Sequence, residues 1–218
     1  MLEAFLADAA QFLPVLMRGL GMTLLLTGGA LIVSILLGLI WVLMGYSRFA
    51  PLRWISRAII NVIRGIPIIV QLFCIYFVLP EWGIDLPPFA AGVLGLGLAY
   101  SVYQAENFRG GLSSVDKDLV EAGTALGMNW PVLMRRVVLP LGIPAALPSL
   151  GNTTIMLLKD SSIASTITIA ELTRAGQLLA ISTFKNGTVY LLIALLYLAA
   201  SLPMAAGVRW LERRFARR

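Results

Sequence analysis

The chain has 218 residues, of which 59% are hydrophobic and only 13% are charged. This composition excludes an ordinary soluble domain and predicts a single integral membrane domain over residues 1–218. The sequence has no histidine and one cysteine, Cys74, which excludes a disulfide scaffold and the common zinc and haem ligand sets. No cofactor is therefore expected. The formal charge of +6 arises from basic residues that lie beside apolar stretches. These residues therefore indicate membrane topology and not nucleic-acid binding.

The first half of the chain contains three predicted membrane spans. Residues 19–47 carry no charge and exceed the roughly 20 residues that a helix needs to cross the hydrocarbon core. A second span is expected from about Ile59 to Leu79, with Arg64 inside it or near its inner end. A third runs from about Phe89 to Arg109. The short acidic connection 80–88 between them is typical of an external loop.

A polar segment follows the third span. Helix-forming or apolar residues recur there at helical spacing and predict a short amphipathic helix: Leu119, Ala122, Ala125 and Leu126. Gly127 is expected to end this helix as a left-handed cap. A second short helix is predicted next, with Asn129 as its cap and Pro131 in its first turn. Arg135 and Arg136 would then lie near its C-terminal end, where the helix dipole favours positive charge.

Two more spans complete the predicted layout. The fourth, from about Val137 to Leu158, contains three prolines, so it should pack inside the bundle where neighbours satisfy the freed backbone groups. Residues 161–170 are too few to cross and predict a re-entrant or outer half-helix, and residues 171–186 predict an external connection. The fifth span covers about 187–208. Five arginines should anchor its end on the inner side: Arg209, Arg213, Arg214, Arg217 and Arg218.

The distribution of basic residues tests this layout. The proposed inner segments carry 13 of the 17 lysines and arginines. By the positive-inside rule, this bias predicts five spans with the N-terminus outside and the C-terminus in the cytoplasm. The fold class expected is therefore an all-α polytopic membrane protein.

Four motifs resemble those of a known family. Glu121-Ala122-Gly123, followed by Gly127 and Leu139-Pro140, resembles the EAA loop of binding-protein-dependent ABC import permeases, with Gly123 where that family usually has alanine. Three other segments look like motifs of the polar amino acid permease branch, namely Arg-Gly-Thr-Pro, Ala-Glu-x-x-Arg-Gly and Leu-Lys-Asp-Thr-Ser: residues 64–71, 103–111 and 158–162. Ile66 and Ser161 replace threonines that are usual in these motifs.

The resemblance implies a five-span type I importer permease of the bacterial cytoplasmic (inner) membrane that moves a polar amino acid by alternating access. It also implies a dimer with a second permease subunit of the same or a related chain, separate ATP-binding cassette ATPase subunits and an extracytoplasmic amino acid-binding protein. The cytoplasmic coupling helix that docks on the ATPase would contain Glu121, Ala122, Gly123, Ala125, Leu126 and Gly127. The alternative interpretation of this segment is an interfacial loop helix without a partner.

Charged side chains in the spans suggest a substrate site. An ionised group at mid-membrane costs roughly 2.5–3.5 kcal/mol, so such a residue needs a partner or a function. For a zwitterionic amino acid, Asp160 and Glu106 are candidate acceptors of the ammonium, and the backbone amides of Ser161 and Ser162 are candidate donors to the carboxylate. The full candidate set is Arg64, Gln71, Glu106, Asn152, Asp160, Ser161 and Ser162.

Each candidate also has a structural interpretation. Arg64 can snorkel to the interface, and Glu106 can pair with Arg109. Lys159 and Asp160 can pair with each other or cap a helix end, and Gln71 and Asn152 can form interhelical hydrogen bonds. The competing function classes are a secondary transporter or channel and a membrane-embedded enzyme. A carrier has no need of a docking helix, and the spans show no nucleophile–base pair or metal-ligand cluster. The chain is therefore expected not to be an enzyme.

Overall fold

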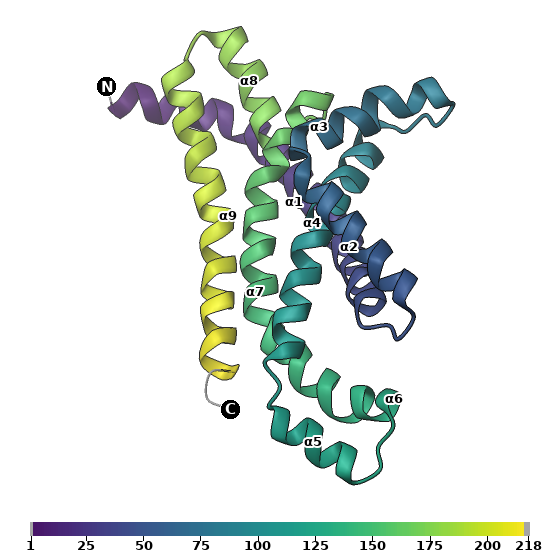
Figure 1. The fold of residues 1–218 in the computed structure, drawn as a ribbon. Coiled ribbons are helices and arrows are strands. Elements are labelled where there is room, and N and C mark those ends of the chain that lie inside the picture. Colours follow the sequence, from purple (N-terminus) through teal and green to yellow (C-terminus); the bar gives the residue numbers. More distant parts are fainter. Residues whose placement is uncertain (1, 216–218) are drawn as a thin grey trace.

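The computed structural model describes residues 2–215, so Arg217 and Arg218 of the predicted C-terminal anchor lie outside the described part. Within this part every regular element is a helix. The helices form an elongated bundle (Figure 1). Five segments of the described chain traverse it: α1 (Leu2–Gly45), a bent segment that begins with α2 (Ala50–Gly65), α4 (Pro88–Ser113), α7 (Leu139–Asp160) and α9 (Asn186–Phe215).

Three helical stretches of the described chain are long and apolar enough to cross a membrane: Phe5–Gly45, Trp130–Ile167 and Asn186–Arg214. The bent segment provides a fourth when its two parts are counted together. The fifth traverse, α4, has 26 residues and is about 39 Å long at the usual helical rise. It lies at the centre and packs mainly against α1 and α7.

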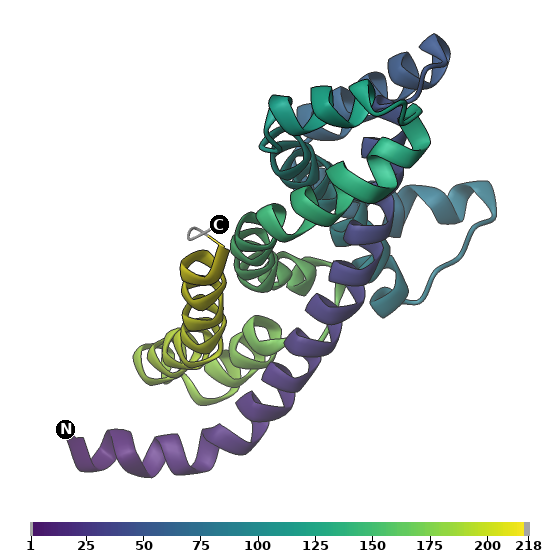
Figure 2. The same ribbon diagram turned by 90° about the horizontal axis from the view of Figure 1, so that it is seen from below.

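The first helix begins much earlier than the predicted span at residue 19. α1 has 44 residues and continues through Pro14, which makes it about 66 Å long against a hydrocarbon core of about 30 Å. In the view from below, it runs diagonally across the molecule (Figure 2). The buried side chains of Phe12 and Leu16 pack with Leu172 of α8 (Leu172–Thr183) and Val189 of α9. The N-terminal part of α1 is therefore anchored to the last two helices.

The second span is broken, which differs from the single span predicted for residues 59–79. α2 ends at Gly65, and the chain then turns by 101° into α3 (Ile68–Phe73), η1 (Cys74–Val78) and η2 (Leu79–Trp82). Ile66 has an extended backbone (φ −109°, ψ 129°). A residue that precedes proline avoids the helical region, so Pro67 explains the position of the break.

α4 and α7 approach each other closely through small residues. A β-carbon on Gly111 would lie 2.6 Å from the Ala146 β-carbon and 2.8 Å from the Ala146 backbone nitrogen. A β-carbon on Gly142 would lie 2.8 Å from Leu112. Small residues at such a crossing are what membrane helices use for close packing. The two helices therefore form one tightly packed pair.

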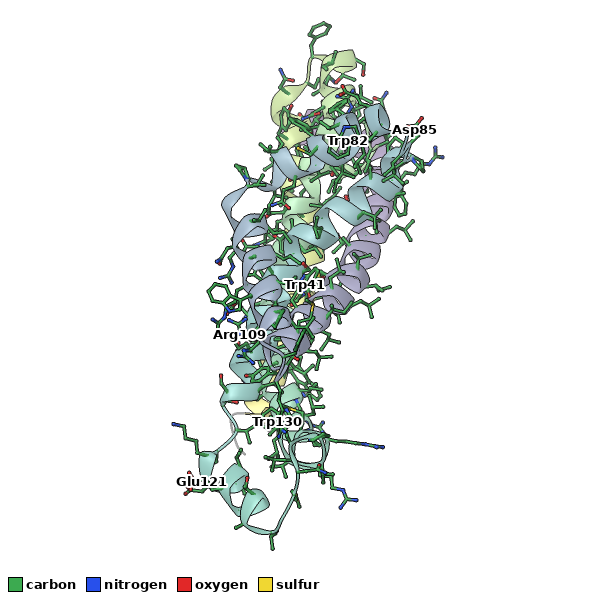
Figure 3. The ribbon with its side chains drawn as sticks, turned by 45° about the vertical axis from the view of Figure 1, so that its right-hand side comes forward. Trp41, Trp82, Asp85, Arg109, Glu121 and Trp130 are labelled. Atoms are coloured by element: carbon green, nitrogen blue, oxygen red, sulfur yellow. The ribbon has the colours of Figure 1, made fainter. Side chains whose placement is uncertain are left out.

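The two ends of the bundle carry different elements. Trp82 and Asp85 lie at one end of the molecule, and Glu121 and Trp130 lie at the other (Figure 3). α5 (Lys117–Ala125) and α6 (Trp130–Leu133) protrude at the same end as the C-terminal end of α9 (Figure 1). α8 lies at the opposite end, and it is followed by α9 after a left-handed Phe184.

Candidate coupling surface and substrate site

The protruding helix α5 has well-defined caps at both ends. The Asp116 side chain accepts a hydrogen bond from the Asp118 amide at 3.0 Å. At the other end, the Gly127 amide donates to the Thr124 carbonyl and the Met128 amide donates to the Gly123 carbonyl, at 2.9 and 3.1 Å. With φ at +79° for Gly127, these two bonds form a Schellman motif. The predicted left-handed cap at Gly127 is confirmed.

The second short helix begins as predicted but does not end near Arg135 and Arg136. The Asn129 side chain accepts a hydrogen bond from the Val132 amide at 3.2 Å and caps α6. α6 then continues without interruption through η3 (Met134–Val138) into α7. The prediction that Arg135 and Arg136 lie at a helix C-terminus is wrong, because residues 132–139 contain no helix-stopping residue.

α5 packs against α6 through Gly123, which is the buried residue of α5. A β-carbon on Gly123 would lie 2.5 Å from the Leu133 methyl carbon Cδ1, so the absence of a side chain allows the close contact. The outer side of the segment is exposed, including 79% of Leu126. We call this outer apolar surface the α5 docking face; it consists of Leu119, Ala122, Ala125 and Leu126. The Glu121 side chain points away from the rest of the molecule (Figure 3).

Glu106 lies between two arginines. Its Oε1 atom is 3.1 Å from Nη1 of Arg109 and 3.6 Å from Nη2 of Arg64. The pair with Arg109 lies within α4, and the pair with Arg64 connects α4 to the end of α2. Glu106 is thus already surrounded by cations, so the predicted structural pairing is present and is joined by Arg64.

Asp160 has a different environment. The Tyr100 hydroxyl donates a hydrogen bond of 2.7 Å to its Oδ2 atom. The ion pairs among residues 2–215 are those of Glu106 and the pair of Lys185 with Asp8, so Lys159 does not pair with Asp160. Lys159 is exposed and Asp160 is half-buried. The alternative in which the two neighbours neutralise each other is therefore not found.

The helix is continuous after Asp160, and one predicted donor, the Ser161 amide, forms hydrogen bonds within it. η4 (Ser161–Ile167) follows α7 directly, and the Ser161 amide already donates to the carbonyls of Leu157 and Lys159. The Ser161 hydroxyl donates to the Leu158 carbonyl at 2.7 Å. The Ser161 amide is thus engaged within the helix in this structure, and its donation to a substrate carboxylate stays a prediction. Ser162 is half-buried in the same turn.

The remaining candidates lie elsewhere. Gln71 is buried, and its Nε2 atom donates to the carbonyls of Ile63 and Ile66, each at 2.8 Å. It thereby bridges the break between α2 and α3, while its Oε1 atom is buried without a partner in the described residues. Asn152 is exposed and precedes Asp160 by eight residues, about 12 Å along α7.

Two residues outside the candidate set tie α4 to α7. One is Tyr100, which reaches Asp160. The other is Asn107, whose Nδ2 atom donates to the Thr153 hydroxyl at 2.7 Å and to the Ser149 carbonyl at 3.3 Å. The sequence offers one signal for both, because a phenol or an amide in an apolar span must find a hydrogen-bond partner. It does not show which partner is found.

These features together define a polytopic membrane protein in which the short helices α5 and α6 protrude from one end of the helix bundle. The family model described as "Binding-protein-dependent transport system inner membrane component" matches residues 34–217, and the chain belongs to this family. The resemblance seen in its motifs and the expected fold class are therefore confirmed.

Similar proteins cover almost the whole chain. The "Probable amino-acid ABC transporter permease protein YckA" of Bacillus subtilis (strain 168) is 36% identical over 208 residues, 95% of this chain and 92% of that protein. The "Glutamine transport system permease protein GlnP" of Escherichia coli (strain K12) is 38% identical and covers 93% of each chain.

Solved structures show the same architecture. A chain of the "Crystal structure of an amino acid ABC transporter with histidines" superposes with a TM-score of 0.90 at 38% identity, covering 95% of this chain and 97% of that one. A chain of the MetNI methionine ABC transporter in an inward-facing conformation superposes with a TM-score of 0.73 at 24% identity, covering 90% and 96%. This second likeness shows the shared fold alone.

Proposed function

We propose that this chain is the permease subunit of an amino-acid ABC importer that uses ATP hydrolysed in separate subunits. The names of YckA and GlnP support the amino-acid class, as does the 38% identical structure, which is that of an amino acid ABC transporter. The observation that carries the proposed coupling is the α5 docking face, an exposed apolar surface on a firmly capped helix.

The connections of α5 explain how a partner can drive the transport cycle. α5 is linked to α4 by the short segment 114–116 and to α7 through the uninterrupted α6 and η3. α4 and α7 are held together by the Gly111 crossing and by Asn107. A displacement of α5 by an ATPase is therefore passed to the helix pair that carries Tyr100 and Asp160.

The distribution of charged residues between the two ends of the bundle supports an orientation in the membrane and a side for each partner. The end with α5 carries Lys117, Arg135 and Arg136, which the positive-inside rule places in the cytoplasm with the C-terminus. The opposite end carries Glu81 and Asp85 near the α2–α4 connection, and there the amino acid-binding protein would deliver its cargo, with the N-terminus on that side. A second permease subunit, identical or related, completes the translocation pathway of the importer.

Asp160 is the residue that we propose to bind the substrate ammonium. Its half-buried carboxylate is partly desolvated in an apolar span, and it forms no ion pair within the described chain. An ammonium group would offset the cost of this desolvation. Arg64 and Glu106, by contrast, already compensate each other.

The coupling proposal is tested with two matched substitutions. Leu126→Asp places a charge in the α5 docking face and should abolish co-purification of the ATPase subunits encoded with this permease. Thr124→Asp adds the same charge at an exposed position of the same helix outside that face, and it should leave assembly intact. Normal assembly of the Leu126→Asp variant would show that α5 is not the docking element.

A wild-type assay tests the transport class. The assembled complex in liposomes, with its binding protein, should accumulate at least one of L-glutamine, L-histidine and L-cystine in an ATP-dependent manner. Failure to accumulate any amino acid from a full panel would overturn the proposed substrate class.

A further inference from the structure

The Asp160 carboxylate is held by one side chain from another helix. Tyr100 of α4 is almost completely buried, with 1% of its surface exposed, and its hydroxyl donates to Oδ2 of Asp160. Asp160 itself is half-buried, and its second oxygen, Oδ1, accepts no hydrogen bond from residues 2–215. One oxygen is therefore fixed from inside the protein while the other is available.

The tyrosine ring is itself fixed. Tyr100 belongs to a core cluster that includes Leu26 of α1, Leu72 of α3 and Leu157 of α7. Its ring also lies 5.6 Å from that of Tyr103, centroid to centroid. A side chain enclosed in this way has few alternative rotamers, so its hydroxyl directs the carboxylate to a single orientation.

We infer that Tyr100 is a positioning residue for substrate binding, which orients Asp160 so that Oδ1 faces the ammonium of the transported amino acid. This inference rests on the proposed function, because it assigns Tyr100 a role in the same site. A charge-assisted hydrogen bond of 2.7 Å is short and directional, which suits it to fixing a carboxylate. Tyr100 acts through Asp160 and does not contact the substrate itself.

The test measures amino acid binding by the purified permease–ATPase complex without the binding protein. The probe is whichever of L-glutamine, L-histidine and L-cystine the wild-type complex binds most tightly. Tyr100→Phe keeps the ring and removes only the hydroxyl, and it should raise the Kd by about tenfold, as expected for loss of a hydrogen bond to a charged group. Tyr103→Phe is the matched control, one turn further along α4, and it should leave the Kd unchanged.

A double-mutant cycle separates positioning from general packing. If Tyr100 acts through Asp160, Tyr100→Phe should have no further effect on the Kd in an Asp160→Asn background. Co-purification of the ATPase subunits with each variant checks that the complex has assembled. An unchanged Kd in Tyr100→Phe, or additive effects of the two substitutions, would overturn the inference while leaving the proposed function in place. Absence of amino acid binding in the wild type would overturn both.

Discussion

At the scale of single residues, Gln71 shows how a polar side chain in an apolar span can satisfy backbone hydrogen-bonding groups. The turn at Pro67 interrupts the helix, so the last carbonyls of α2 lose their usual amide partners. From the first turn of the following helix, the Gln71 amide donates to the carbonyl of Ile63 in the last turn of α2 and to that of Ile66 at the break. Gln71 therefore stabilises the bend from within.

We expect Gln71→Met to destabilise the assembled complex by about 1–3 kcal/mol, because the carbonyls of Ile63 and Ile66 lose their donor. Loss of the unpaired Oε1 atom offsets part of this cost. The measurement is the apparent melting temperature of the purified complex, which should fall. Gln11→Met, at an exposed position on α1, is the control and should melt like the wild type. Equal melting temperatures for the two variants would show that Gln71 does not support the bend.

At the scale of elements, neighbouring glycines in α4 have opposite environments. A β-carbon on Gly111 would meet the backbone of α7, whereas a β-carbon on Gly110 would meet nothing within 4 Å. Backbone atoms cannot rotate away as a side chain can, so a methyl group at residue 111 must push the helices apart. The α4–α7 pair is the connection between α5 and Asp160, and its spacing should matter for coupling.

Gly111→Ala should therefore cost about 1–3 kcal/mol, the usual range for overpacking, and reduce the transport obtained per ATP hydrolysed. Gly110→Ala should be neutral or stabilising by up to about 1 kcal/mol, because alanine is the better helix former. Melting temperature and transport per ATP in liposomes measure both effects. If the two variants behave alike, the close crossing of α4 and α7 is not required.

The local elements were predictable from the sequence, and the contacts between helices were not. Gly127 and Asn129 act on residues within four positions of themselves, so their capping roles follow from residue type and spacing. The bond between Tyr100 and Asp160 joins residues 60 positions apart. Its existence depends on how α4 and α7 pack, and no periodicity in either helix specifies that. The same reason applies to the 101° bend, since a proline marks its place but not its angle.

At the scale of the whole molecule, successive traversing helices connect opposite ends of the bundle. This arrangement determines which loops lie on the same side of the membrane. Asp85 lies between η2 and α4, and Ser114 lies where α4 gives way to α5, so one 26-residue helix separates them. Asp85 lies at the opposite end from Glu121 (Figure 3). If α4 crosses the membrane, the two positions must lie on opposite sides. Both residues are exposed, so substituted cysteines there should be accessible.

We expect the two introduced cysteines to be labelled from opposite sides of the membrane. A Cys74→Ala background removes the single native cysteine, which is itself exposed. In intact cells with a permeable outer layer, an impermeant maleimide should label Asp85→Cys. Ser114→Cys should react only after the membrane is opened, because the basic segments beside it favour the cytoplasm. Sealed vesicles of inverted orientation should give the reverse pattern, which controls for differences in intrinsic reactivity. Labelling of both cysteines from one side would mean that α4 does not cross, and the five-traverse layout would be wrong.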